Sequence, residues 1–268
     1  MFDRLRAENE TLNDEARMGF LEHLNELRTR LIRAAVALVV GVLICFFFAE
    51  TLYAWLLMPL MDALPENKKS VYFLNPVEPF LVYLKVSFLA GLFVASPAVL
   101  YQIWKFVAPG LYPREKKAVL PFVLFGSLFF VGGALFCRYV VLPTGLEALM
   151  GVGFQTELFD VQSQITMDEY FGVATKLMLA FGVVFELPVV VLFLSWVGMI
   201  NHKTLLRHWR GFVVGAFVVG AILTPPDVMT QLMLAGPIML LYLLSIGIAY
   251  LFGNRNAAPP EGVEDEDD

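Results

Sequence analysis

Residues 86–104 read VSFLAGLFVASPAVLYQIW and contain no charged side chain. A helix rises about 1.5 Å per residue, so about 20 apolar residues cross the roughly 30 Å apolar core of a bilayer. Other runs of similar length hold at most one charge each: residues 31–49, 118–137, 177–200 and 228–253. The sequence therefore predicts five membrane-spanning helices.

The composition of the whole chain also points to the membrane. Hydrophobic residues make up 58% of the 268 residues and charged residues only 16%, whereas a soluble domain carries about 25% charged residues. The chain therefore has too little charge to cover a water-exposed surface. Two cysteines argue against a disulfide-stapled secreted domain, and a net charge of -6 argues against a nucleic-acid-binding protein.

A sixth uncharged run, residues 211–226, is shorter and ends in two prolines. It reaches about 24 Å, less than an unperturbed bilayer, but we count it as a span because only Asp227 separates it from the next run. The polar leader (1–17) has no signal-peptide pattern, and the acidic tail (254–268) is expected to be disordered. Between them, residues 18–253 form an all-α membrane domain with six predicted spans: 31–49, 86–108, 118–142, 173–200, 211–226 and 228–252.

The distribution of basic residues predicts the orientation. Six spans put both termini on one side, and 14 of the 19 Lys and Arg residues fall on that side. Cytoplasmic loops carry the excess of Lys and Arg, so both termini are predicted to be cytoplasmic. The remaining five basic residues belong to the outer side: Lys68, Lys69, Lys85, Arg138 and Lys176.

The two outer loops are too long to be bare connectors, so we expect a structured outer cap. Residues 51–58 read as a short amphipathic helix at the outer interface, broken at Pro59. Thr166 and Glu169 have the spacing of a capping box, which predicts a helix start there.

Glu186 is the sharpest single anomaly, because it lies within the apolar run 177–200. An ionised side chain in that position costs about 2.5 to 3.5 kcal/mol on insertion scales and marks a candidate functional site. The alternative is a protonated carboxyl that makes a structural hydrogen bond between helices. Pro188 predicts a kink nearby.

Two acidic residues lie close to the membrane on the predicted inner face. Glu26 belongs to an amphipathic helix that runs into the first span, and Glu115 lies on a short proline-containing loop. Glu22, Glu26 and Arg30 follow one another at i,i+4 spacing, so a solvated face with internal ion pairs explains the helix. Two convergent carboxylates would alternatively make a site for a guanidinium group.

The enzyme interpretations are weak. The sequence has no G-x-S-x-G, H-E-x-x-H or Walker A motif, and its three histidines (His23, His202, His208) lack ligand spacing. We therefore expect no catalytic residue, metal or cofactor. Cys45 and Cys137 could meet within the bilayer, but buried free thiols are favoured.

A set of motifs spread along residues 18–253 resembles the TatC family, the multispanning subunit of the twin-arginine protein translocase. The motifs are FLEHLNELRTRL (20–31), SP (96–97), YQIWKF (101–106), APGLYPRE (108–115), FGVVFELP (181–188) and LTPPD (223–227). The resemblance implies a curved six-helix bundle in the bacterial inner membrane, with spans five and six short. It also implies a non-enzymatic role in protein transport.

The resemblance implies a receptor that binds the twin-arginine signal peptide of folded cargo proteins. The two family carboxylates that bind the arginine pair fall on Glu26 and Glu115. Arg28, Phe106, Pro109 and Tyr112 belong to the same implied peptide site.

The implied partners are the single-span subunits TatA and TatB, in multiple copies, for export driven by the proton motive force. Glu186, Thr224 and Gln231 are implied to contact these partners, and Pro59, Pro97 and Asp227 to act as structural elements. Two rival interpretations remain: a proton-coupled secondary transporter that uses Glu186, and an intramembrane hydrolase. The first normally shows repeat symmetry, which is not evident here, and the second lacks a nucleophile and base.

Overall fold

The computed structural model describes residues 2–64, 69–107, 119–151, 155–156, 159–160, 165–223 and 228–252, with the side chains of α1 described from His23 onward. These residues are helical apart from short connections and one pair of antiparallel strands, each of two residues. The elements in chain order are α1 (Phe2–Phe46), α2 (Ala49–Ala63), α3 (Glu78–Val107), α4 (Val119–Phe136), the π-helix η4 (Cys137–Val141), α5 (Leu142–Gly151), β1 (Gln155–Thr156), β2 (Phe159–Asp160), α6 (Met167–Phe185), α7 (Leu187–Trp196), α8 (His202–Arg207), α9 (Trp209–Leu223) and α10 (Val228–Phe252).

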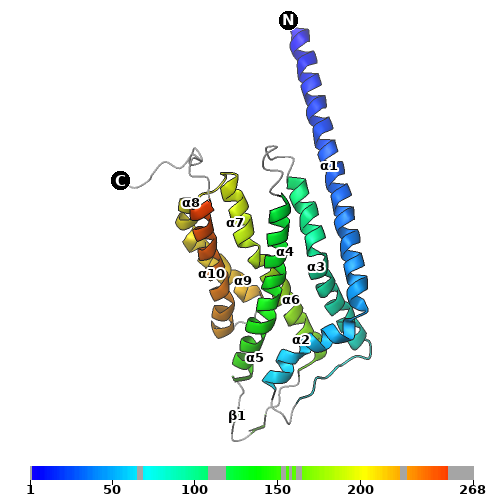
Figure 1. The fold of residues 1–268 in the computed structure, drawn as a ribbon, viewed down its shortest axis with the longest axis vertical. Helices are drawn as coiled ribbons and strands as arrows, with labels where there is room; N and C mark the ends of the chain where they lie inside the picture. Colours follow the sequence, from blue (N-terminus) through cyan, green and yellow to red (C-terminus); the bar gives the residue numbers. More distant parts are fainter. Residues whose placement is uncertain are drawn as a thin grey trace, which may run out of the picture.

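The long helices run up and down, so the start of α1 and the end of α10 lie at the same end of the bundle (Figure 1). We call this end the basic end, because it holds Arg30 and Arg33 of α1, Lys105 of α3 and Arg207 of α8. The opposite end, which we call the cap end, holds α2 and the β1–β2 hairpin (Figure 1).

Long apolar helices lie where five of the spans are predicted, although several of their ends and one predicted length differ. In the described part of the chain, five helical segments are long and apolar enough to cross a membrane, and the apolar helix over Trp209–Ile222 is shorter. Span five is therefore short, as predicted. Span six is not: α10 has 25 residues, because its uncharged sequence continues the helix through Pro237.

The predicted boundary at residue 18 falls inside α1, which is one helix from Phe2 to Phe46.

Helix α1 approaches α3 closely where Gly41 of α1 meets Gly91 of α3. A Cβ on Gly41 would lie 2.7 Å from the carbonyl oxygen of Gly91, so the two backbones approach too closely for a larger residue. The other faces of α1 expose Leu31, Val36 and Leu43, which suits contact with lipid.

The cap end is tied together by Glu78, at the start of α3. Its carboxylate accepts hydrogen bonds from the backbone N–H groups of Leu74 (2.9 Å) and Asp168 (2.8 Å). Lys85 forms an ion pair with Asp168. Counting uncharged residues predicted that this span begins at 86. The helix begins at 78 because its two charged residues, Glu78 and Lys85, have partners at the cap.

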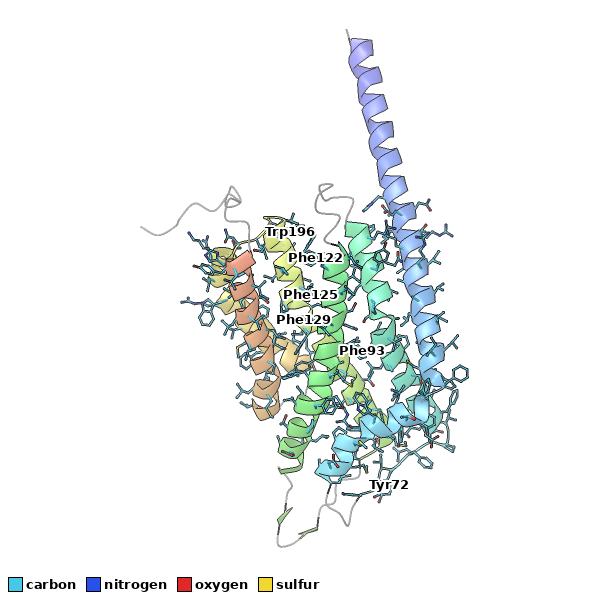
Figure 2. The ribbon with its side chains drawn as sticks, in the orientation of Figure 1. Tyr72, Phe93, Phe122, Phe125, Phe129 and Trp196 are labelled. Carbon is cyan, nitrogen blue, oxygen red and sulfur yellow. The ribbon has the colours of Figure 1, made fainter. Side chains whose placement is uncertain are left out.

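The predicted helix start at Thr166 is confirmed. The Thr166 hydroxyl accepts a hydrogen bond from the backbone N–H of Glu169 (3.4 Å), so Thr166 is the N-cap of α6. A short bridge precedes it, in which the N–H of Met167 donates to the carbonyl of Tyr72 (2.9 Å). Tyr72 lies at the cap end in Figure 2. Cys45 and Cys137 are buried free thiols, as favoured from the sequence.

The prediction that Pro59 breaks the outer helix is wrong. α2 continues through Pro59 to Ala63, and Pro59 is buried. Proline has no N–H, so the carbonyl of Trp55, four residues earlier, loses its helical donor. The Arg138 side chain replaces that donor: its Nε lies 3.0 Å and its Nη2 2.5 Å from the Trp55 oxygen.

Arg138 is buried, with only 5% of its surface exposed. Its guanidinium also lies 5.0 Å from the ring centroid of Trp55 and 5.2 Å from that of Tyr139, at cation–π distance. Arg138 belongs to the π-helix η4. A π-helix has i→i+5 hydrogen bonds and more residues per turn than an α-helix, so its side chains point in different directions from those of an α-helix. The cap helix α2 is therefore fastened to the α4–α5 segment by one cation.

We predict that Arg138 and Pro59 are energetically coupled. Arg138→Met should destabilise the protein by about 1 to 3 kcal/mol, because it leaves the partly buried Trp55 carbonyl without a donor. In a Pro59→Ala background the backbone regains an N–H at position 59 that can donate to that carbonyl, so the cost of Arg138→Met should be smaller by about 1 kcal/mol. Thermal or denaturant unfolding of the four proteins in detergent measures the coupling, and strictly additive effects would contradict this account.

Candidate functional site

Glu26 lies on α1 at the basic end, in a shallow pocket of about 280 Å³ lined by Asn25, Glu26, Thr29, Arg30 and Arg33. These residues share one face of α1 because they are spaced one, three and four positions apart. The Arg30 guanidinium forms an ion pair with Glu26, and its Nε lies 3.0 Å from Glu26 Oε1. The internal pair predicted from the i,i+4 spacing is confirmed.

His23 joins this part of α1 to the end of α3. Its ring stacks on that of Phe106, with 4.5 Å between centroids and 19° between planes. Its Nδ1 lies 3.8 Å from Glu26 Oε2, an ion pair when the imidazole is protonated. Glu26 and the half-buried Phe106, both predicted for the same site, are thus linked through a residue that the sequence interpretation did not assign to it.

Among the other predicted peptide-site residues, Arg28 is not joined to this pocket. Arg28 is exposed and does not line it; two residues along a helix correspond to about 200° of rotation, so it points away from Glu26. Pro109, Tyr112 and Glu115 lie outside the described residues, and their roles stay predictions.

Glu186 lies at the junction of α6 and α7, where the helix is interrupted. Its backbone N–H donates to the carbonyl of Val183 (3.1 Å), which tightens the last turn of α6. Pro188 falls in the first turn of α7. The N–H groups of a first turn have no carbonyl partner within their own helix, so the N–H that proline lacks costs no helical hydrogen bond. A disturbance of the helix near Pro188 is confirmed as an interruption at Glu186, and the bend itself stays a prediction.

The Glu186 carboxylate faces a glycine. A Cβ on Gly126 of α4 would lie 3.1 Å from Oε2 and 3.3 Å from Oε1 of Glu186. Within the described part of the chain, the buried Oε1 atom has no hydrogen-bond partner, and neither has the buried Oε1 of Gln102 on α3. Neither Gln102 nor Gly126 was assigned a role from the sequence. The polar side chain of Gln102 in an apolar run was a usable signal, whereas the role of Gly126 depends on packing.

Aromatic side chains fill the bundle between α3, α4 and α7 on the side of the basic end. The ring of Trp104 lies 4.6 Å from that of Phe193 and 5.2 Å from that of Phe122. Figure 2 shows Phe122, Phe125 and Phe129 following one another along α4 below Trp196. Phe125 is 57% exposed, so this column offers an apolar surface outside the core as well as within it.

The remaining predicted residues have structural contacts or lie outside the described residues. Gln231 of α10 donates from Nε2 to the carbonyl of Phe217 on α9 (2.8 Å). Pro97 lies inside α3 and removes the donor for the Phe93 carbonyl, which accepts from the Ser96 hydroxyl instead (2.7 Å). Thr224 and Asp227 are not among the described residues. No group of three or more His, Cys, Asp or Glu side chains that could hold a metal ion was found within the described ranges.

The fold and composition define a multi-pass helical membrane protein. The family model for the Sec-independent protein translocase protein (TatC) matches residues 22–237. The chain belongs to this family. It is therefore a component of the Sec-independent protein translocase, a non-enzymatic transport subunit, and a multi-pass protein of the bacterial inner membrane.

Relatives and solved structures agree with this assignment. The chain is 43% identical over 257 residues to the TatC protein of Koribacter versatilis (strain Ellin345), covering 94% of this chain and 92% of that one. It is 41% identical over 234 residues to the TatC protein of Aquifex aeolicus (strain VF5), covering 87% and 95%. A crystal structure of the twin-arginine translocase receptor TatC in DDM superposes with a TM-score of 0.76 at 39% identity, over 85% of this chain and all of that one.

We predict that Gly126 is needed to seat the Glu186 carboxylate. Gly132, on the same helix, has nothing within 4 Å of an added Cβ, so Gly132→Ala should stabilise the protein by about 0.5 to 1 kcal/mol through helix propensity. Gly126→Ala should lose this gain, because its Cβ displaces the carboxylate. In a Glu186→Ala background the difference between the two substitutions should shrink, because only the contact of the added Cβ with Leu100 Cδ1 (3.3 Å) remains. An undiminished difference without the Glu186 side chain, measured by unfolding in detergent, would contradict the prediction.

Proposed function

We propose that the chain is the signal-peptide receptor and core subunit of a twin-arginine translocase. It binds the twin-arginine signal peptide of folded cargo proteins and recruits TatA and TatB for export driven by the proton motive force. Similar solved structures are described as a twin-arginine translocase receptor, which supports the proposal. The basic end faces the cytoplasm in this proposal, because the sequence assigns 14 of the 19 Lys and Arg residues to the side that holds both termini.

The observation that carries the receptor proposal is the ion pair in which Glu26 binds the guanidinium group of Arg30. A carboxylate that accepts both Nε and Nη2 of Arg30 has the geometry and surroundings for an arginine side chain. An arginine of the peptide would offer the same chemical group, a guanidinium. A lysine would offer only a compact, strongly hydrated ammonium, which cannot reproduce the planar fork.

We propose Glu115 as the second carboxylate, on the connection that follows α3. The stacking of His23 on Phe106 holds the Glu26 region of α1 against the end of α3, which favours a site shared by the two acids. Arg28, Pro109 and Tyr112 complete the proposed peptide site. The apolar segment of the peptide would then follow the aromatic column of α4, where Phe125 is exposed.

Glu186, Thr224 and Gln231 are proposed as the contact for the single-span partners. Glu186 supports this because its carboxylate oxygen has no partner among the described residues, and a polar group inside a membrane favours a helix that brings a hydrogen-bonding side chain. The bond from Gln231 to the Phe217 carbonyl fixes that side chain against α9, so we assign it a positioning role. We expect several copies of the chain in each complex.

The transporter interpretation of Glu186 is not adopted. Membership of a protein translocase family gives the chain a role in protein transport, and repeat symmetry is not evident in the sequence.

The receptor proposal is tested by crosslinking a twin-arginine signal peptide to the protein in nanodiscs. Glu26→Ala and Glu115→Ala should each weaken capture about tenfold or more, because each removes a charge-assisted hydrogen-bond acceptor. A twin-lysine peptide should be captured poorly by the wild type.

Glu50→Ala is the matched control, since Glu50 is an exposed acid on α2 at the cap end. It should capture the arginine peptide as well as the wild type does. Equal capture by wild type, Glu26→Ala and Glu115→Ala would remove the two carboxylates from the site.

A further inference from the structure

The Glu26 carboxylate is already paired within the protein. Arg30 lies one helical turn away and places Nε 3.0 Å from Glu26 Oε1, with Nη2 on the same oxygen. The Arg30 side chain is only 12% exposed, whereas that of Glu26 is 32% exposed. The cation of this pair is thus the more enclosed partner, and the carboxylate is the one that faces the pocket.

The pairing has a consequence for any arginine that approaches Glu26. Arg30 presents the same planar donor group as the incoming side chain, and it already occupies Oε1 of Glu26 with both Nε and Nη2. A bidentate fork across both carboxylate oxygens can therefore form with an arriving guanidinium only as Arg30 gives up Oε1.

The arrangement also protects the empty site. A carboxylate at the membrane surface without a partner would bear a desolvation penalty that rises as the surroundings become less polar. Arg30 pairs with the carboxylate when no peptide is bound, and the arginine of the peptide pairs with it when one is bound. The exchange of one guanidinium for another then keeps the charge and hydrogen bonding of Glu26 nearly constant, so that binding is readily reversed.

We propose that Arg30 is an internal placeholder for the ligand's arginine: it occupies Glu26 in the empty receptor, must be displaced on binding and recaptures the carboxylate on release. This inference rests on the proposed function, in which Glu26 binds the peptide. As a pure competitor, Arg30 lowers the affinity for every ligand of Glu26 by the same factor and does not set the preference for arginine over lysine.

The test is an equilibrium titration of full-length protein in nanodiscs with a fluorescent twin-arginine signal peptide. Arg30→Gln should raise the affinity about two- to fivefold, the range expected when a partly screened helical ion pair no longer competes. Arg30→Lys, which keeps the charge but loses the fork, should give a smaller rise. The affinity ratio between twin-arginine and twin-lysine peptides should not change.

Two control proteins separate displacement from general charge. Arg33 lines the same pocket but lies seven residues from Glu26 along α1, so Arg33→Gln should raise the affinity less than Arg30→Gln does. In a Glu26→Ala background, Arg30→Gln should have no effect, because nothing remains to compete for. Unfolding curves of each variant confirm that it is folded.

The remaining outcomes overturn the proposal. An unchanged or lower affinity of Arg30→Gln would mean that Arg30 is inert or orients Glu26. The effect would be long-range repulsion if Arg30→Gln still raised the peptide affinity in a Glu26→Ala background. It would also be long-range repulsion if Arg33→Gln raised the affinity as much as Arg30→Gln does. If wild-type protein fails to bind the twin-arginine peptide at all, the receptor function itself fails, and this result is distinct from the others.

Discussion

Backbone hydrogen bonding in an apolar medium is the constraint on which this structure depends. A carbonyl that loses its helical donor inside a membrane must find another within the protein. The chain meets this need with side chains at two prolines. Arg138 donates to the carbonyl freed by Pro59, and the Ser96 hydroxyl donates to the carbonyl freed by Pro97. The helix containing Pro59 thereby becomes a fastened cap helix.

The same constraint explains the interruption at Glu186. Pro188 is harmless to the backbone because α7 begins just before it, so the interruption leaves no missing donor in the middle of a helix. At this interruption the Glu186 carboxylate faces α4 at Gly126, which leaves room for it. Among the described residues the Oε1 atom of Glu186 has no hydrogen-bond partner, so packing against α4 positions this oxygen inside the bundle. Such a group has binding capacity left for a partner.

Local sequence signals predicted much of the fold. The capping box at Thr166, the interruption near Pro188 and the pairing of Glu26 with Arg30 all depend on residues within four positions of one another. The start of α3 and the continuation of α2 through Pro59 were missed because both depend on distant partners. Asp168 lies 90 residues from Glu78, and Arg138 lies 83 from Trp55. No pattern of local spacing contains those contacts.

For the candidate site, sequence interpretation identified the acids but not what surrounds them. Glu186 is conspicuous because it is the single charge in an apolar run, whereas Glu26 was identified by its place near the membrane and by the family resemblance. The stacking of His23 on Phe106 and the room at Gly126 arise only when helices meet. The functional meaning of the Arg30 pair likewise depends on the pocket around it, since the same i,i+4 pair on an open helix face would be an ordinary surface ion pair.

The central claim is that Glu26 receives an arginine of the peptide, and a double-mutant cycle across the complex tests it most directly. Each arginine of the peptide pair is replaced in turn by glutamine, and binding to wild-type and Glu26→Ala protein is measured. The account predicts that at least one replacement weakens binding to the wild type about tenfold but changes binding to Glu26→Ala by less than about twofold. Equal losses on both proteins for both arginines would show that Glu26 does not contact them.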